Sequence, residues 1–445
     1  MAWENCGDIN FENTRLAAGK ESADGNIVLF AQKSIENNTG IFGTNQIYYV
    51  IIRKVKDQGT GNWSDWNELP RAVNPGRGPA DPNTGKPYSF ETGSPILIGR
   101  GLNDVLEVFA VANGPDVQSS FIWQSEKRDN GSWDWLIIDA AMGLNDYSAA
   151  NNGRLNLFDL YSNVDFNEFR QRKEGGIIKW PDSPDDTMKG PDGVNLTSIK
   201  LIADKDNLLE IFALNKSLWH RKQNQDNSWA DWESFKHPDL PPPNSSGTGA
   251  GVGRAPQAAP TSSAFSNGLK WIARKIASAV AKIGAAIRAF FTFVPIGEFT
   301  SNQVVVLGEN SMINFFCIAD DNNVYTKHQK TVADGGGGWS DWESLGSPGK
   351  GQMLAAAINP TMNHRLIVLY SLGKNGELAR KKQVIKGQGG TGQLSWGDWE
   401  SLPLPDGAQS IEDIKISWIE TLQTDTGTDA FIVDTNNMTI WHWSD

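Results

Sequence analysis

The sequence predicts an all-β protein built from a repeated sheet. Its 445 residues include 45 glycines and 18 tryptophans, and a composition rich in turn-forming and aromatic residues favours strands over helices. A short element with two tryptophans recurs along the chain, and two strand patterns recur between its copies. Hydrophobic residues make up 39% of the chain and charged residues 21%, so the chain can bury a core of ordinary size.

The repeated element is a Trp-x-Asp-Trp sequence followed by a short apolar stretch. Two versions have diverged: GSWDWL at 131–136 is one residue shorter, and IIKWPDSPDD around Trp180 has a single tryptophan. The chain ends in WHWSD and begins with MAWEN, so the two termini together form one further copy. The four complete copies are GNWSDWNELP (61–70), NSWADWESF (227–235), GGGGWSDWESLG (336–347) and LSWGDWESLP (394–403).

Counting the divided copy gives seven elements, and this repetition indicates a ring of sheets. All but one of the intervals between copies suit a four-stranded propeller blade of roughly 45–50 residues with loop insertions. A ring has no free sheet edge when its last sheet takes a strand from the opposite terminus. We therefore predict a seven-bladed β-propeller that is closed by the N- and C-terminal strands.

Two strand patterns supply the inner part of each blade, and the tryptophan element is expected to form the fourth, outer strand. The first pattern is almost continuously apolar, which is typical of a strand buried on both faces. The second alternates and ends in Lys, Arg or Gln, which is typical of a strand with one wet side. The first pattern occurs at 24–32, 103–111, 153–160, 206–214, 312–323, 364–376 and 429–437, and the second at 47–54, 121–127, 166–173, 218–223, 324–330, 378–383 and 440–445.

The paired tryptophans have a structural interpretation and a functional one. An indole supplies a large apolar surface and one N–H donor, so one ring in each blade can wedge between adjacent sheets. We expect this role for the second tryptophan of each pair. The aspartate between the two is expected to accept hydrogen bonds from nearby backbone or indole N–H groups and so to fix the turn.

The repeat, its seven copies and the shared terminal closure resemble those of the bacterial seven-bladed propeller lectins of the PLL type. More loosely, they resemble the tachylectin and tectonin propeller lectins. In those lectins, fucose or related sugars bind in shallow sites between neighbouring blades, lined by Trp and small polar residues. The resemblance therefore implies a non-catalytic lectin with several sites, whose single weak contacts add up through multivalency.

A sugar site needs an aromatic ring for the C–H face of the sugar and paired donors and acceptors for its hydroxyls. The blades that keep the tryptophan motif best supply the candidates, with an aromatic residue of the preceding strand as the alternate. The carbohydrate-binding candidates are Trp63, Trp229, Trp339 and Trp396, and the alternates are Trp123, Trp219, Tyr325 and Trp441.

One interval is much longer than the others and indicates an insertion in the fifth blade. Residues 239–268 are rich in Pro, Gly, Ser and Ala and are typical of a flexible linker, whereas 269–295 have the pattern of a cationic amphipathic helix. The propeller is expected to occupy 1–238 and 296–445. The apolar side of the predicted helix contains Leu269, Ile272, Ile276, Val280, Ile283, Ile287, Phe290 and Val294, and the opposite side contains Lys270, Arg274, Lys275, Lys282 and Arg288.

This predicted helix has three possible partners. It can pack on its own propeller, lie in a membrane surface, or dock into an apolar groove of another protein. Its charges and its short apolar runs argue against a transmembrane span. The leading interpretation is thus a lectin whose helix contacts a membrane or a partner. The alternative is a structural propeller, a component or cargo of a larger assembly, that docks through 269–294.

Several function classes find no support in the sequence. The net charge of −12 argues against nucleic acid as a partner. The two cysteines form no metal-binding pattern, and no common catalytic or cofactor motif is present, so we expect neither a cofactor nor an enzyme. His220, His328 and His442 occupy similar places in the wet strand and are expected at the surface. The N-terminal segment lacks the pattern of a Sec signal, so we expect synthesis in the cytoplasm, with release or non-Sec export left open.

Overall fold

The fold is described from a computed structural model of the chain. The described residues are 3–9, 15–21, 25–37, 46–70, 89–90, 95–102, 105–113, 120–127, 133–141, 144–161, 164–174, 177–181, 184–215, 217–235, 299–309, 312–319, 321–330, 338–349, 351–360, 364–373, 376–386, 393–405, 415–424 and 427–444. Residues 1–236 and 298–445 belong to one compact unit. Its described strands form seven antiparallel sheets of four or five strands and one two-stranded sheet.

The sheets are numbered here in chain order, and the last one combines both termini. Sheet 1 contains β2 (Leu16–Lys20), β3 (Ile27–Asn37), β4 (Gln46–Lys56) and β5 (Asn67–Glu68); sheet 2 contains β6 (Ser89–Phe90), β7 (Leu97–Arg100), β8 (Leu106–Asn113), β9 (Ser120–Lys127) and β10 (Trp133–Ala141). Sheet 3 contains β11 (Leu144–Asn151), β12 (Leu155–Tyr161), β13 (Asp165–Arg170) and β16 (Asp186–Lys189), and β14 (Arg172–Glu174) pairs with β15 (Ile177–Lys179). Sheet 4 contains β17 (Ser198–Ala203), β18 (Leu209–Leu214), β19 (Leu218–Lys222) and β20 (Glu233–Phe235); sheet 5 contains β21 (Phe299–Leu307), β22 (Ile313–Ala319), β23 (Val324–His328) and β24 (Glu343–Gly346). Sheet 6 contains β25 (Gly351–Asn359), β26 (Leu366–Gly373), β27 (Leu378–Lys386), β28 (Gln393–Trp396) and β29 (Glu400–Ser401); sheet 7 contains β30 (Ile416–Gln423), β31 (Thr428–Asp434), β32 (Thr439–Ser444) and β1 (Trp3–Asp8).

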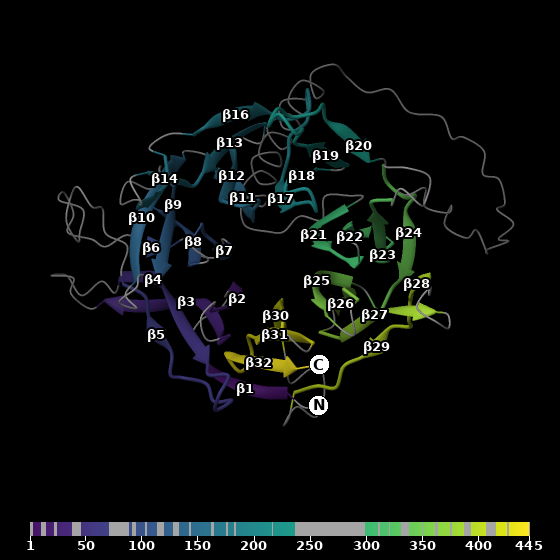
Figure 1. Ribbon diagram of the computed structural model, residues 1–445. Helices are drawn as coiled ribbons and strands as arrows, with labels where there is room; N and C mark the ends of the chain where they lie inside the picture. The colour runs from purple at the N-terminus through teal and green to yellow at the C-terminus, as the bar shows by residue number, and fades with distance from the viewer. Residues whose placement is uncertain are drawn as a thin grey trace, which may run out of the picture. The chain divides into compact units, whose positions relative to one another are not determined.

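The innermost strands of neighbouring sheets contact one another in a closed cycle: β2, β7, β11, β17, β21, β25, β30 and again β2. Figure 1 shows the sheets arranged radially around this cycle. A closed ring of radial antiparallel sheets is a β-propeller, so the predicted all-β propeller is confirmed.

The two termini complete one sheet, as the sequence predicts. Strand β1 pairs antiparallel with β32, and Trp3 lies opposite Trp443 in the register. The indole N–H of Trp3 also donates a hydrogen bond to the Pro403 carbonyl oxygen at 2.7 Å, which ties this outermost strand to sheet 6. Closure therefore removes the free edge that either terminal strand would otherwise present.

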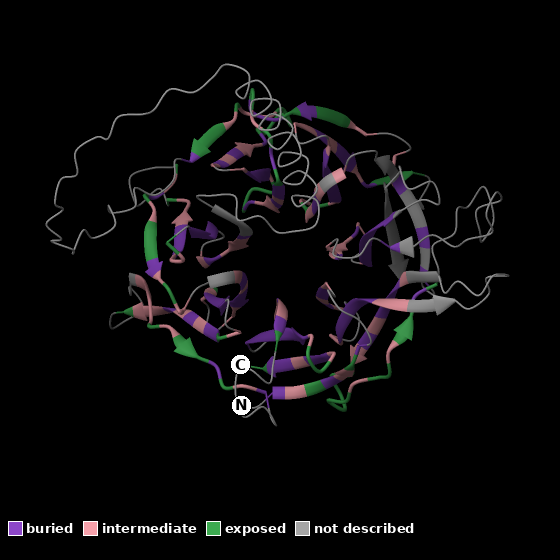
Figure 2. Ribbon diagram, turned by 180° about the vertical axis from the view of Figure 1, so that it is seen from behind, coloured by how far each residue is buried: buried purple, intermediate pink, exposed green. Residues whose placement is uncertain are grey.

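The two inner strand patterns are confirmed in every sheet. Each apolar run forms the second strand, and β18, β22 and β31 are buried along their entire lengths. Each alternating run forms the third strand, and in β19 buried and half-buried residues alternate over Leu218–Arg221. Figure 2 shows the consequence: buried residues fill the strands inside each sheet, whereas exposed residues collect on the outer strands. The core thus lies between sheets, where second strands face each other.

The outer strands agree with the prediction only in part. In sheet 2 the tryptophan element forms the start of the outer strand β10, whereas β5, β20, β24 and β29 each begin directly after the second tryptophan of their element. In three elements the first tryptophan makes only a single bridge to the third strand, as in Lys56↔Trp63. In sheet 3 the fourth strand is β16, which starts six residues beyond Trp180. A hydrophobic pattern indicates a strand but does not indicate how its side chains pack on the next sheet, so it could not predict where the fourth strands begin.

Side chains link the innermost strands of adjacent sheets, which share no backbone ladder. The Ile199 N–H donates to the Asp146 carboxylate at 2.9 Å, and the Trp418 indole N–H donates to the Leu16 carbonyl oxygen at 3.1 Å. Burial raises the pKa of Asp146, because the charged carboxylate loses its hydration. The ring is therefore held by specific polar links as well as by apolar packing.

The predicted linker (239–268) and amphipathic helix (269–295) lie outside the described residues, so both stay predictions. In the part of the chain that the structure describes, no helix has the length and apolar character of a membrane span. Cys6 and Cys317 are both free and buried. Burial raises the pKa of each thiol, so both are poor nucleophiles.

Candidate functional site: the sheet interfaces

In six of the seven elements, the first or only tryptophan packs edge-on against an aromatic ring of the preceding sheet. In each case the partner is a phenylalanine of the second strand, and the ring planes are inclined by 70–89°. Such T-shaped contacts are favourable because the positive ring edge meets a negative ring face. The pairs, with centroid distances, are Trp63–Phe431 (6.3 Å), Trp133–Phe30 (5.5 Å), Trp180–Phe109 (5.8 Å), Trp229–Phe158 (5.7 Å), Trp339–Phe212 (5.6 Å) and Trp396–Phe316 (5.7 Å).

In three elements the second tryptophan binds the outer part of the preceding sheet through its N–H group. Trp232 donates to the Lys189 carbonyl oxygen at 2.9 Å, and Trp399 donates to the Leu345 carbonyl oxygen at 2.8 Å. Trp3 occupies the same role in the divided copy. The predicted structural role of the second tryptophan is therefore confirmed at these interfaces. The first tryptophan is also part of the packing, which the sequence interpretation did not assign to it.

In the four complete copies, a cation of the third strand lies over the second tryptophan. The distances from the charged group to the ring centroid are 5.6 Å for Lys54–Trp66, 5.7 Å for Arg221–Trp232, 5.5 Å for Lys327–Trp342 and 5.4 Å for Lys381–Trp399. Burial lowers the pKa of Lys327, and the nearby carboxylate of Asp341 opposes that shift. The aspartate of the motif thus faces a cation, as well as being exposed to water.

The serine of the motif fixes the turn that was expected to depend on the aspartate. The Ser64 hydroxyl accepts from the Val55 N–H at 3.1 Å and donates to the Asp65 carbonyl oxygen at 2.9 Å. Ser340 repeats this arrangement with His328 and Asp341. The expected hydrogen bonds to the aspartate carboxylate are therefore replaced by bonds of the serine hydroxyl.

A polar cluster surrounds Trp63 at the interface between sheets 7 and 1. Lys56 Nζ lies 2.6 Å from Glu4 Oε2, which also lies 3.0 Å from His442 Nδ1. The His442 ring stacks on Phe431 and contacts the edge of Trp63, with centroids 5.9 Å apart. Burial raises the pKa of Glu4, but its hydrogen bonds with Lys56 and His442 outweigh this and leave the pKa lowered. The Glu4 side chain is 40% exposed, so the cluster reaches the surface.

A related cluster, with a buried glutamate in place of the partly exposed one, lies around Trp339 between sheets 4 and 5. His220 Nε2 lies 2.7 Å from Glu210 Oε2, and the other carboxylate oxygen of Glu210 accepts from Gln329 Nε2 at 2.7 Å. The His220 ring packs on Phe212 and lies 5.3 Å from the Trp339 centroid. Two interfaces therefore combine a half-buried tryptophan with a histidine and a glutamate.

His220 and His442 occupy the same register position, opposite Phe212 and Phe431 in the neighbouring strand. Both are buried, with 6% and 3% of their surface exposed, so the expectation of surface histidines is wrong for these two. The error arose because an alternating strand was assumed to have one wet side. In a propeller, that side faces the next sheet. The histidine–phenylalanine register was the signal that could have revealed both clusters.

The remaining candidates are divided among different interfaces. Trp219 and Trp229 pack against the same apolar cluster between sheets 3 and 4, and Trp441 packs against the cluster between sheets 6 and 7. Tyr325 is buried, and its hydroxyl donates to Asp321 at 2.8 Å. Trp396 is half-buried against Phe316. The side chain of Trp123 lies outside the described residues, although its backbone belongs to β9.

Within the described residues, no group of three or more His, Cys, Asp or Glu is arranged to hold a metal ion. The chemistry that the two clusters offer is hydrogen bonding beside an aromatic surface. Each supplies charged donors and acceptors that are already paired within the protein. Such groups can exchange hydrogen bonds with hydroxyl groups without a change of net charge.

No family model and no curated protein matches the sequence. Many solved structures resemble the fold, and they include the following three at low identity. A triple mutant of AofleA from Arthrobotrys oligospora is 10% identical over 91% of this chain and 90% of its own, with a TM-score of 0.45. The NanB sialidase of Streptococcus pneumoniae is 9% identical over 98% and 69%, with a TM-score of 0.42. The Aleuria aurantia lectin, described as a six-bladed β-propeller with a novel fucose recognition mode, is 11% identical over 90% and 100%, with a TM-score of 0.40. None of these likenesses assigns a ligand or an activity to this chain.

Proposed function

We propose that this protein is a non-catalytic, multivalent lectin that binds neutral glycans between adjacent blades. In this proposal each of the seven sheets is one blade, and sheet 7 is the blade shared by the termini. The resemblance to the PLL-type propeller lectins favours fucose or a related sugar as the ligand. The binding surfaces are the interfaces around Trp63 and Trp339.

The observation that carries the proposal is the contact of Trp63 with Lys56 and His442, both of which bind Glu4. Trp63 is half-buried, so part of its ring remains accessible for the C–H face of a sugar. Lys56 and Glu4 lie beside it and form an ion pair of 2.6 Å. A sugar hydroxyl that donates to Glu4 and accepts from Lys56 fits this pair. Because Lys56 and Glu4 already pair with each other, a neutral sugar suits this pair better than a charged one.

The second cluster supports multivalency. Trp339 also lies beside a histidine, and the exposed carboxylate of Glu233 lies 3.8 Å from His220 Nδ1. The two interfaces are formed by different sheets, so one molecule can engage two glycans on the same surface. Two weak contacts on one rigid ring bind a clustered ligand more tightly than either does alone.

The test is a fucosylated glycan array, followed by titration of methyl α-L-fucoside against the full chain. Trp63→Leu is expected to weaken binding to the array at least tenfold. Trp180→Leu is the matched control, because Trp180 packs on Phe109 with almost the same geometry but belongs to an interface without the histidine–glutamate cluster. No binding of the full chain to any glycan at high density would contradict the proposal. Equal losses in both variants would do so as well.

The proposal also excludes turnover. Fluorogenic fucosides and sialosides are expected to remain intact in the presence of the protein. If hydrolysis occurred and a single carboxylate substitution such as Glu210→Gln abolished it, the non-catalytic assignment would be wrong. Thermal unfolding of this variant must be measured beside it, because Glu210 is buried and holds both His220 and Gln329.

A further inference from the structure

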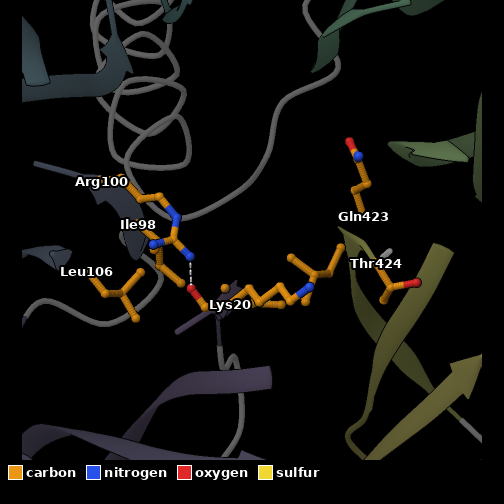
Figure 3. Close-up of a pocket in the computed structure, with 10 residues that line it drawn as sticks. Lys20, Ile98, Arg100, Leu106, Gln423 and Thr424 are labelled. Atoms are coloured by element: carbon orange, nitrogen blue, oxygen red, sulfur yellow. Dashed lines mark hydrogen bonds between the residues drawn. The ribbon is translucent and has the colours of Figure 1, made fainter. Parts of the chain in front are cut away.

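A pocket lies away from these interfaces, where the innermost strands of sheets 7, 1 and 2 end. Its volume is about 430 Å³, within the range of roughly 300–1,000 Å³ that small-molecule sites occupy. Lys20, Arg100 and Gln423 are the last residues of β2, β7 and β30, and all three line it. Figure 3 shows Arg100 directed toward Lys20, with Gln423 and Thr424 on the far side of the pocket.

The backbone of the pocket brings two cations together. The Arg100 guanidinium donates a hydrogen bond to the Lys20 carbonyl oxygen, and Asn151 Nδ2 donates to the Arg100 carbonyl oxygen at 2.5 Å. Gly19 allows β2 and β7 to approach, because a Cβ atom there would lie 3.2 Å from Ile98 Cγ2. Both cationic side chains are half-buried. Two cationic side chains therefore line one pocket of a chain whose net charge is −12.

The other walls provide apolar surface and neutral polar groups. Ile98 and Leu106 form one side of the pocket. The Thr424 hydroxyl oxygen accepts from the Gly427 N–H at 3.0 Å, so its own proton is free to be donated to a ligand. Gln423 is exposed and offers an amide that both donates and accepts. The residues that line this pocket include none of those in the clusters around Trp63 and Trp339.

We propose that this pocket binds an acidic monosaccharide. Its carboxylate lies between Lys20 and Arg100, because guanidinium and ammonium groups make strong charge-assisted hydrogen bonds with carboxylates. Its hydroxyls meet Gln423 and Thr424, and its C–H face meets Ile98 and Leu106. The pocket adds a charged ligand to the neutral one assigned to the blade interfaces, and the two sites share no residue.

Isothermal titration of the full chain with D-glucuronate tests this, with D-glucose as the neutral control. Glucuronate is expected to bind and glucose to bind at least tenfold more weakly. Lys20→Gln is the main variant, because it keeps the backbone carbonyl that holds Arg100. Arg100→Gln is the second variant. Each is expected to weaken glucuronate binding at least tenfold. Lys205→Gln is the matched control, since Lys205 follows the innermost strand of sheet 4 and is exposed beside Asp206.

Three results would overturn the proposal: no heat of binding with glucuronate at millimolar concentration, equal binding of glucose, or unchanged glucuronate binding by Lys20→Gln. Binding of inorganic phosphate but not of glucuronate would overturn the carboxylate assignment. Trp63→Leu is expected to leave glucuronate binding unchanged. That control separates a failure of this site from a failure of the lectin interfaces.

Discussion

Trp3 and Trp443 pack against each other across the two terminal strands, with ring centroids 5.3 Å apart and ring planes inclined by 55°. Both are buried, with 5% and 4% of their surface exposed. Residues from the two ends of the sequence therefore share one apolar cluster, together with Tyr370 of sheet 6. This contact joins β1 to the rest of sheet 7 and packs sheet 7 against sheet 6. The same side chains therefore close the ring and fill the core between these two sheets.

The first prediction concerns this closure. Replacing Trp3 by Ala is expected to lower the free energy of unfolding by about 3–5 kcal/mol, because it removes a large buried side chain and its hydrogen bond to Pro403. Urea denaturation measures the change. Asn67→Ala, at an exposed position of the outer strand β5, is the control and is expected to stay within about 0.5 kcal/mol of wild type. A loss below about 1 kcal/mol for Trp3→Ala would show that the terminal strand contributes little to closure.

The second prediction concerns Glu420, which is half-buried on the innermost strand β30. Burial raises its pKa to about 7, although Lys200 opposes the shift. The ordinary value is 4.5, so the folded state binds this proton more tightly than the unfolded state does. The contribution of Glu420 to stability is therefore fully present below pH 4.5 and is lost as the pH rises through 7.

Glu420→Gln removes this dependence. We expect the variant to become progressively more stable than wild type between pH 5 and pH 8, as measured by thermal unfolding across that range. Glu68→Gln, an exposed acid of β5, is the control and should keep the wild-type profile. Parallel profiles for wild type and Glu420→Gln would contradict the raised pKa.

The third prediction concerns the close approach of sheets 2 and 3. A Cβ atom added at Gly99 would lie 2.7 Å from Leu155 Cδ1 of the next sheet. Gly99→Ala is therefore expected to destabilise the fold by about 1–3 kcal/mol through overpacking. Gly61→Ala is not a suitable comparison, because Gly61 has a positive φ of 73°.

Leu155→Ala, alone and combined with Gly99→Ala, tests whether Leu155 is the side chain that a methyl group at position 99 would meet. It costs stability by itself, but it opens the space that a methyl group at position 99 would enter. The double variant should therefore be more stable than the sum of the two single losses predicts. Simple additivity in urea denaturation would mean that Gly99 does not limit the distance between these sheets.

The sequence was informative about strands and poor about interfaces. The apolar run that contains Phe212 and the alternating run that contains His220 could be assigned because hydrophobic periodicity reports strand type directly. The terminal copy of the motif also predicted the pairing of Trp3 with Trp443. The partner of each tryptophan could not be predicted, because Trp339 and Phe212 belong to different sheets and no local pattern connects them.

Trp180 illustrates the same limit. Its motif has lost the second tryptophan, and the sequence interpretation placed the outer strand there. The structure places that strand at β16 and keeps Trp180 packed on Phe109. The contact with the preceding sheet persists without the rest of the motif because a single ring is enough to make it. The residues that form an interface thus come from two sheets, whereas the sequence motif lies within a single sheet.

The last prediction concerns residues 239–295, whose sequence pattern predicts a linker and a cationic amphipathic helix. Strand β20 ends at Phe235 and β21 begins at Phe299, so the described propeller lies on either side of this segment. Replacing 239–295 by a flexible Gly/Ser linker is therefore expected to leave thermal unfolding and fucoside binding unchanged.

If the predicted helix lies on a membrane surface, the full chain should co-sediment with vesicles containing anionic lipid and the shortened chain should not. Arg274→Glu together with Lys282→Glu in the full chain is the matched test, since it reverses two charges without shortening the chain. Retained vesicle binding in both variants would place the contact on the propeller itself. Loss of fucoside binding would instead show that the segment contributes to the sugar sites.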